Sequence, residues 1–254
     1  MAVLTSRVAL ITGGSRGVGA EIARKLASLG ARVALVGRDE AALTRVANET
    51  GGLVLVADVT DRNALFSAVQ RAERELGTIG ISVHNAGIAP SAPLAATDDA
   101  TWDRTMAVNV KPAFWLAQWL VPKMVAAGWG RIIHVASNAG LTGYAYTSAY
   151  CASKHALVGF TRALAAEIAR TPVTVNAVCP GFLETEMTDA TVATIALKTK
   201  RSLEEARSYL ESLSPQKRLI QTAEVAHVVG MLCADEGRAL HGTAIPIDGG
   251  QVMT

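Results

Sequence analysis

A phenol and an ammonium stand four residues apart in the stretch Tyr150-Cys151-Ala152-Ser153-Lys154. On a helix these two positions share one face, so the Lys154 charge can reach the neighbourhood of the Tyr150 hydroxyl. A nearby cation lowers the pKa of a tyrosine from its usual value of about 10, which would let Tyr150 exchange protons near neutral pH. An ordinary amphipathic helix can carry the same two residues, so the elements around them determine whether the pair is catalytic.

A glycine-rich turn follows the first apolar run, in a position where it could bind a dinucleotide. The residues TGGSRGVG at 12–19 lead directly into the helical pattern AEIARKL. Glycines let the backbone approach a pyrophosphate, and the free N–H groups of a helix start attract its charge. The spacing is GxxxGxG rather than GxGxxG, so the order of strand, turn and helix supports the prediction more than the glycines do. The expected cofactor contacts are Gly13, Ser15, Arg16, Gly17, Val18 and Gly19.

The end of the second apolar strand indicates which dinucleotide is bound. An acidic residue there would bind the adenosine ribose, whereas an arginine would accept a 2′-phosphate. This strand ends in Gly37-Arg38, and Arg38 with Arg16 would form a clamp for that phosphate. Asp39 and Glu40 are better placed as first-turn residues of the next helix. The sequence therefore favours NADP(H) over NAD(H).

Composition excludes several classes of protein. The chain has 254 residues, a net charge of +2 and no block of like charges, so neither nucleic acid nor a membrane surface is expected as a partner. Its three cysteines form no close pair, which argues against a disulfide framework and a zinc site and fits a reducing cytoplasm. A small-molecule substrate is the better expectation.

Apolar, β-branched runs alternate with helical segments along the whole chain. Strands are expected at 8–11, 33–36, 53–56, 81–83, 132–135, 173–178 and 244–247. Continuous apolar strands that alternate with helices predict an α/β fold, a doubly wound parallel sheet of the Rossmann type, in a single domain over 1–254. Residues 182–214 depart from this alternation, because two helical patterns follow one another there. We expect them to form a helical insert that covers the substrate; the alternative is a helical hairpin on the surface.

Several motifs in order resemble the short-chain dehydrogenase/reductase family from Arg7 to about Gly250. They are the glycine turn, NAG at 85–87, Ser137 thirteen residues before Tyr150, the Tyr-x-x-x-Lys pentapeptide, and NAVCPG at 176–181. The resemblance implies a catalytic tetrad. Tyr150 would be the general acid and base, and Lys154 would lower its pKa and bind the ribose. Ser137 would bind the substrate oxygen, and Asn109 would support a water-linked proton relay.

Carbonyl chemistry independently supports these roles. Hydride that arrives at a carbonyl carbon leaves charge on the oxygen, which then needs hydrogen-bond donors and a proton together. Without the pattern, Asn109 could equally be a polar helix breaker and Ser137 a cap.

The resemblance implies further cofactor contacts. Asp58 and Val59 would contact the adenine, although an aspartate at a strand end could also cap the next helix. Asn85, Ala86 and Gly87 would line the riboses, and Pro180, Gly181 and Thr185 would hold the nicotinamide. His84 stands where the family often has asparagine and has no second ligand at chelating spacing, so no metal is assigned.

The expected substrate pocket is mostly apolar. Besides Ser137 and Tyr150, its lining residues would be Leu141, Tyr144, Tyr146, Phe182, Leu183 and Met187, with no arginine to bind a free carboxylate. This favours a ketone or a 3-oxoacyl thioester over a small keto acid. Resemblance to 3-oxoacyl reductases, polyketide ketoreductases and 3-hydroxybutyrate dehydrogenases leaves those alternatives open. The turn AAGWGRII lacks the basic residues of carrier-protein-dependent reductases, which favours a coenzyme A thioester or a free ketone.

Two helical segments, 148–170 and 112–127, are apolar on more than one face, so each needs a second partner. The resemblance implies that this partner is another subunit, in a homotetramer; the alternative is a monomer with unusually buried helices. A non-catalytic dinucleotide sensor is the competing class of function. An intact set of Asn109, Ser137, Tyr150 and Lys154 favours the enzyme, because a sensor needs no proton relay.

Overall fold

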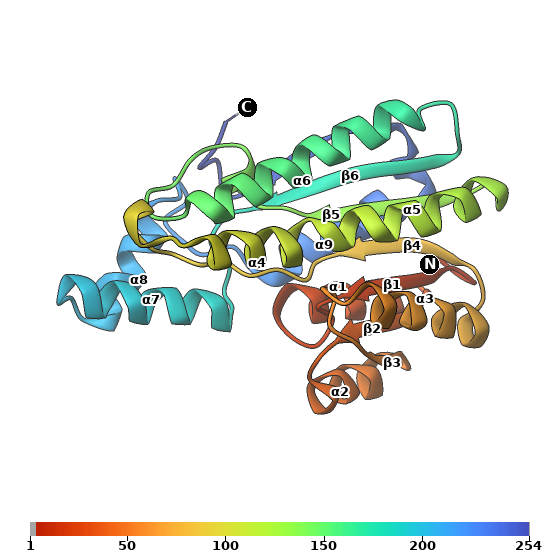
Figure 1. Cartoon of the computed structure of the whole chain (residues 1–254), viewed down its shortest axis with the longest axis horizontal. Coiled ribbons are helices and arrows are strands. Elements are labelled where there is room, and N and C mark those ends of the chain that lie inside the picture. Colours follow the sequence, from red (N-terminus) through yellow and green to blue (C-terminus); the bar gives the residue numbers. More distant parts are fainter. Residues whose placement is uncertain (1–3, 254) are drawn as a thin grey trace.

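Parallel strands form the centre of the molecule, which a computed structural model describes for residues 4–253 (Figure 1). Within those residues one seven-stranded sheet has the order β3-β2-β1-β4-β5-β6-β7, and every neighbouring pair is parallel. The strands are β1 Val8–Thr12, β2 Arg32–Gly37, β3 Leu53–Val56, β4 Ile79–His84, β5 Gly130–Val135, β6 Val173–Pro180 and β7 Ala244–Ile247. The predicted doubly wound parallel sheet is confirmed.

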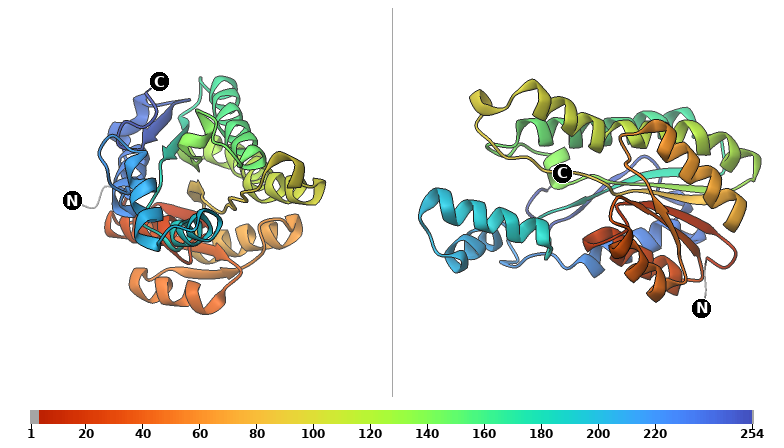
Figure 2. Two further views of the ribbon diagram at one scale, coloured as in Figure 1. Left: turned by 90° about the vertical axis from the view of Figure 1, so that its left-hand side faces the viewer. Right: turned by 60° about the horizontal axis from the view of Figure 1, so that its bottom comes forward.

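Helices cover both faces of this sheet (Figures 1 and 2). One layer contains α1 Gly17–Ser28, α2 Glu40–Thr50 and α9 Thr222–Cys233, and the other contains α3 Arg62–Leu76, α5 Lys111–Ala126 and α6 Ser148–Glu167. Strand residues alternate between the two cores: Ala9 and Ile11 pack with the first layer, whereas Val8 and Leu10 pack with the second. This double burial explains why the strands are continuous apolar runs.

Two aspartates fix the starts of helices that follow strands. Asp39 accepts a hydrogen bond from the Ala42 backbone N–H at 3.0 Å and is the N-cap of α2. Asp61 does the same for α3 through the backbone of Asn63 and Ala64. Asp58, for which capping was the alternative, instead accepts from the Thr60 backbone N–H at 2.9 Å in a turn before α3.

The strand order reverses between β1 and β4, because β2 lies on one side of β1 and β4 on the other. In open α/β sheets, ligands bind at such a switch point, outside the carboxyl ends of the strands. Thr12 ends β1 and His84 ends β4, so the glycine turn and the NAG motif meet there. The topology thus places the expected cofactor motifs together.

The two helices expected in 182–214 are confirmed as α7 Glu186–Thr199 and α8 Leu203–Ser212. They pack on each other around Val192, Ala206, Leu210 and Leu219, and extend beyond one end of the sheet (Figure 1). A short parallel bridge between Leu183 and Ile220 closes the base of this insert. Among residues 4–253, no helix is long and apolar enough to cross a membrane.

Candidate active site

The four expected catalytic residues come from three elements that meet at the carboxyl end of the sheet. Ser137 follows β5 and begins the short turn η2 (Asn138–Gly140), while Tyr150 and Lys154 lie one turn apart on α6. Asn109 is the last residue of α4 (Asp99–Asn109). Asn109, Lys154 and Ser137 are buried, and Tyr150 is partly buried.

Lys154 lies beside Tyr150 but directs its charge elsewhere. Its Nζ is 5.7 Å from the centre of the Tyr150 ring and donates to the Val135 carbonyl at 2.9 Å. Burial lowers the pKa of Lys154 to about 8. Burial also raises the pKa of Tyr150, and the neighbouring Ser137 hydroxyl opposes that rise. The expected lowering of the Tyr150 pKa by Lys154 is not found, because desolvation of the phenolate dominates and the Lys154 charge is not among the groups that shift this pKa.

Asn109 ties the end of α4 to α6. Its Oδ1 accepts from the Ile88 N–H at 2.9 Å, and its Nδ2 donates to the Ile88 carbonyl and to Ser153 Oγ, each at 2.9 Å. Ser153 Oγ in turn donates to the Tyr150 carbonyl at 2.7 Å. All polar atoms of the amide are thus used for positioning, and the backbone of the Tyr150 turn is held through Ser153.

His84 is a functional neighbour whose role the sequence did not reveal. Its Nε2 lies 3.0 Å from the Asn109 carbonyl, and its Nδ1 lies 3.4 Å from Thr12 Oγ1. Thr12 Oγ1 already accepts from the Asn85 and Ala86 N–H groups, so its proton is free for Nδ1 and the Nε2 proton is assigned to the Asn109 carbonyl. Burial lowers the pKa of His84 to about 4 and keeps the ring neutral.

His84 therefore connects the cofactor motifs to Asn109. Its place at the end of a buried strand, directly before NAG, is the sequence signal that could have pointed to it. In the described part of the chain, no group of three or more His, Cys, Asp or Glu side chains could hold a metal ion.

The glycine turn has the shape that a pyrophosphate cradle needs. Gly13 and Gly17 have φ of 66° and 53°, in the left-handed region that favours glycine. A Cβ at Gly19 would lie 2.1 Å from the Gly13 carbonyl oxygen. The N-cap Arg16 makes no side-chain capping bond, and the first turn of α1 carries no acidic residue, so this helix end is available to an anion. The residues present fit a dinucleotide phosphate.

Replacing Gly19 with alanine is expected to destabilise the protein and weaken cofactor binding. The added methyl group conflicts with backbone that cannot give way, at a cost of about 1–3 kcal/mol. Thermal unfolding and NADPH fluorescence titration measure both effects. Gly159→Ala on α6 is the matched control, because nothing lies within 4 Å of its Cβ position. If Gly19→Ala and Gly159→Ala had the same melting temperature and the same affinity for NADPH, the close approach of Gly19 to Gly13 would be contradicted.

Arg16 and Arg38 are exposed and weakly paired. Arg38 Nη1 lies 3.7 Å from Asp58 Oδ2, and Arg16 Nη1 lies 3.4 Å from Glu186 Oε2. Exposed pairs of this kind contribute about 0–1 kcal/mol, so both guanidinium groups can turn toward an anionic ligand. The Arg38–Asp58 pair also brings together two of the expected adenosine contacts, and Val59 beside Asp58 is buried.

The expected nicotinamide contacts lie next to the glycine turn. The Pro180 carbonyl is 3.4 Å from Ser137 Oγ, and the Gly181 N–H donates to the Ile247 carbonyl at 3.1 Å. The Thr185 methyl group would be 3.6 Å from a Cβ at Gly17. Asn85, an expected ribose contact, is tied to the glycine turn: its Nδ2 donates to the carbonyls of Thr12 and Gly13 at 3.1 Å each.

Two of the expected substrate residues contact each other, and one lies apart. The rings of Tyr144 and Phe182 form an edge-to-face pair with centres 6.3 Å apart. Leu141 packs against the small buried cluster that contains Leu157 and Cys179. Met187, in contrast, is 54% exposed in the first turn of α7.

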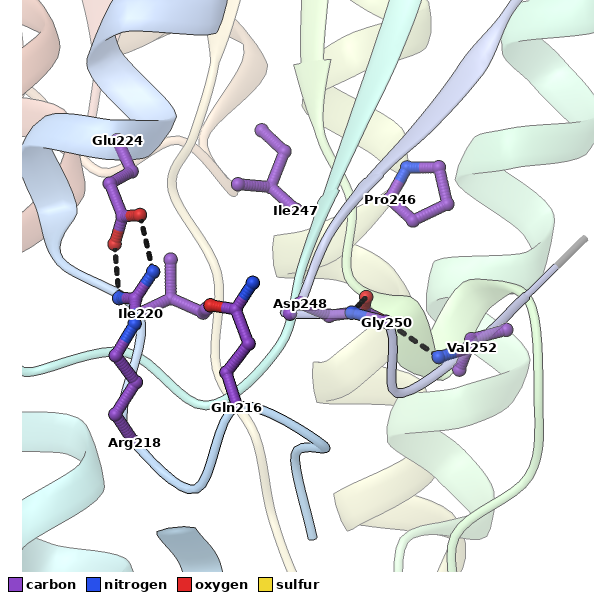
Figure 3. A pocket seen from close by; sticks show the side chains of 10 residues that line it. Gln216, Arg218, Ile220, Glu224, Pro246, Ile247, Asp248, Gly250 and Val252 are labelled. Atoms are coloured by element: carbon purple, nitrogen blue, oxygen red, sulfur yellow. Dashed lines mark hydrogen bonds and ion pairs between the residues drawn. The ribbon is translucent and has the colours of Figure 1, made fainter.

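A pocket of about 350 Å³ lies between the segment 216–224 and the C-terminal segment 246–252 (Figure 3). None of the four expected catalytic residues lines it; the lining consists of Gln216, Arg218, Ile220, Glu224, Pro246, Ile247, Asp248, Gly249, Gly250 and Val252. The buried Asp248 accepts from the Gly250 and Val252 N–H groups and lies 3.4 Å from Asn138 Nδ2. Asp248 thus links the C-terminal segment to the turn that begins at Ser137, through Asn138.

Comparison with known proteins shows the family to which the chain belongs. A family model described as short chain dehydrogenase matches residues 7–196, so the chain belongs to the short-chain dehydrogenase family. It is 38% identical over 250 residues to the granaticin polyketide synthase putative ketoacyl reductase 1 of Streptomyces violaceoruber, covering 96% of this chain and 92% of that one. It is 37% identical over 257 residues to a 3-oxoacyl-[acyl-carrier-protein] reductase of Pseudomonas aeruginosa, covering 99% of both.

A solved structure gives the same result in three dimensions. A single-substitution variant of the actinorhodin polyketide ketoreductase, crystallised with NADPH, superimposes with a TM-score of 0.94 at 33% identity, over 99% of both chains. The protein is thus an oxidoreductase of this family, a family that uses nicotinamide dinucleotides, and its relatives include ketoreductases and 3-oxoacyl reductases.

Proposed function

We propose that this protein is an NADP(H)-dependent reductase that reversibly converts a 3-oxoacyl thioester into the 3-hydroxyacyl thioester. The observation that carries the proposal is the convergence of Ser137, Tyr150, Lys154 and Asn109 at the sheet edge where the glycine turn lies. Gly87 supports it, because a Cβ there would lie 3.4 Å from Asn109 Oδ1 and 3.6 Å from Lys154 Nζ. Such closeness leaves the NAG backbone in direct reach of the catalytic side chains.

Each side chain has a defined task in this proposal. When bound, NADPH supplies the hydride to the carbonyl carbon. Ser137 and Tyr150 donate hydrogen bonds to the carbonyl oxygen, and Tyr150 transfers its proton as negative charge develops there. With its raised pKa the phenol is protonated at neutral pH but is a weaker acid than a free tyrosine, so proton transfer requires that the phenolate be stabilised. Lys154 stabilises the phenolate that remains, and Asn109 holds the helix ends in register.

The cofactor preference is tested at Arg38. Arg38→Gln is expected to lower kcat/KM for NADPH by about 10- to 100-fold and to change that for NADH little, because a charge-assisted bond to the 2′-phosphate is lost. Arg45→Gln is the control, an exposed arginine on α2 close in sequence. Preference of the unmodified protein for NADH would refute the role assigned to Arg16 and Arg38.

Initial rates with three substrates test the proposed substrate class. Acetoacetyl-CoA, an N-acetylcysteamine 3-oxoacyl thioester and a bulky cyclic ketone are compared with NADPH at pH 7. Turnover of the thioesters supports the proposal, since the site residues Leu141, Tyr144 and Phe182 offer an apolar wall. Turnover of the cyclic ketone alone would overturn the thioester assignment.

The second candidate is reduction of a polyketide or another free ketone. The likeness to the granaticin and actinorhodin ketoreductases favours it, whereas the resemblance to 3-hydroxybutyrate dehydrogenases rests on the insert sequence alone. We further propose that α7 and α8 cover the substrate and that the cytoplasmic protein is a homotetramer. Exposed apolar side chains on α4 and α5, Trp102, Phe114 and Val125, support the assembly, which the mass from light scattering tests.

A further inference from the structure

The hydroxyl of Tyr144 is buried and has no hydrogen-bond partner among residues 4–253. Such a group costs about 1–3 kcal/mol, so folded proteins retain few of them. Tyr144 lies between η2 and α6, on the loop that connects Ser137 to Tyr150. An unsatisfied donor on this loop indicates that the bound ligand supplies its hydrogen-bond acceptor.

Asn138 is the polar side chain that acts on the Tyr144 hydroxyl, but it makes no hydrogen bond of good geometry with it and its own bonds go elsewhere. The nearby Asn138 directs its Nδ2 to Gln251 Oε1 at 3.1 Å and to Asp248 Oδ2 at 3.4 Å. Burial, and then the charge of Asp248, raises the pKa of Tyr144 to about 12 although Asn138 opposes this rise. The group therefore remains O–H at every working pH and is available as a hydrogen-bond donor.

Phe182 covers this side chain and belongs to the insert. Its ring stands edge-on to that of Tyr144, at an interplanar angle of 72°. Phe182 also packs against the cluster of Val192, Ala206 and Leu210 that joins α7 and α8. A shift of the insert would therefore also move the ring that packs on Tyr144, next to the expected substrate position at Ser137 and Tyr150.

We propose that the Tyr144 hydroxyl donates to a second substrate oxygen, so that the site selects 1,3-dicarbonyl compounds; this rests on the proposed ketone reduction. Ser137 and Tyr150 would hold the oxygen that is reduced, and Tyr144 the acyl oxygen two carbons along. A 3-oxoacyl thioester and a polyketide chain share this pair of oxygens, whereas a simple ketone lacks the second one. A site that hydrogen-bonds a substrate group discriminates strongly against the analogue without it.

Two substrates that differ in one carbonyl oxygen test the proposal. Ethyl 3-oxobutanoate has the second oxygen, and 4-ethoxybutan-2-one replaces that carbonyl by CH₂. Tyr144→Phe is expected to lower kcat/KM for the ester about tenfold, and that for the ether ketone less than twofold. Tyr209→Phe is the control, because it removes a phenol hydroxyl from a side chain that is 46% exposed and lies outside the expected pocket lining.

Stability provides a second readout. Removing an unsatisfied buried hydroxyl should leave the melting temperature of Tyr144→Phe unchanged or higher. Equal losses of kcat/KM on both substrates, or no loss on either, would overturn the role of Tyr144 while leaving ketone reduction intact. If the unmodified protein reduces neither these substrates nor the thioesters, the proposed function fails and this inference fails with it.

Discussion

Tyr150→Phe is expected to lower kcat by about 10²- to 10⁴-fold, because the variant lacks the group placed to give a proton to the carbonyl oxygen. Ser137 still donates to that oxygen, so a residual rate remains. NADPH binding should stay within about twofold, since the glycine turn and Arg38 do not touch the Tyr150 hydroxyl. Stopped-flow single turnovers and fluorescence titration separate the two effects.

The same variant distinguishes an enzyme from a dinucleotide sensor. A sensor would keep its response to cofactor after loss of Tyr150, and no turnover would exist to lose. Tyr209→Phe controls for the general effect of removing a phenol hydroxyl, because Tyr209 is exposed and lies outside the expected pocket lining. A Tyr150→Phe protein that retains the rate of the unmodified protein would refute general acid catalysis by this residue.

The fold was predictable because its determinants are local. The seven strands appear in the sequence as apolar runs. The five inner strands are largely buried on both faces, whereas the edge strands β3 and β7 are only partly buried. Boundaries were less accurate: the sheet extends β4 back to Ile79 and β6 forward to Pro180. Both extensions add residues that pair with neighbouring strands, which no local pattern shows.

The site was predictable only in part. The motifs that hold Tyr150, Lys154 and the glycine turn are contiguous, so their neighbours could be expected from spacing. The bond from His84 to the Asn109 carbonyl joins residues 25 positions apart. The pKa of Tyr150 depends on burial by the whole fold, and that burial reversed the expected direction. Long-range contacts and desolvation thus limit what a single sequence reveals.

Acid is expected to destabilise the protein strongly between pH 6.5 and pH 4, through two buried histidines. Burial lowers the pKa of His84 to about 4 and that of His134 to about 3, from 6.5. Since the unfolded chain binds these protons first, stability is complete above pH 6.5 and falls as pH decreases through that range. At about 1.4 kcal/mol per pKa unit, the largest possible loss in the free energy of unfolding is about 3 kcal/mol from His84 and about 5 kcal/mol from His134.

The two contributions are not additive, because repulsion from a charged His84 accounts for part of the His134 shift. Urea unfolding at pH 7, 6, 5 and 4.5 should therefore show a loss of several kcal/mol that steepens below pH 6. His134 Nδ1 lies 2.8 Å from Thr161 Oγ1, so His134→Gln retains a donor without a titrating group and should flatten the curve. His227→Gln, on an exposed face of α9, should not. A stability that is constant from pH 7 to 4.5 would mean that neither ring is buried in its neutral form.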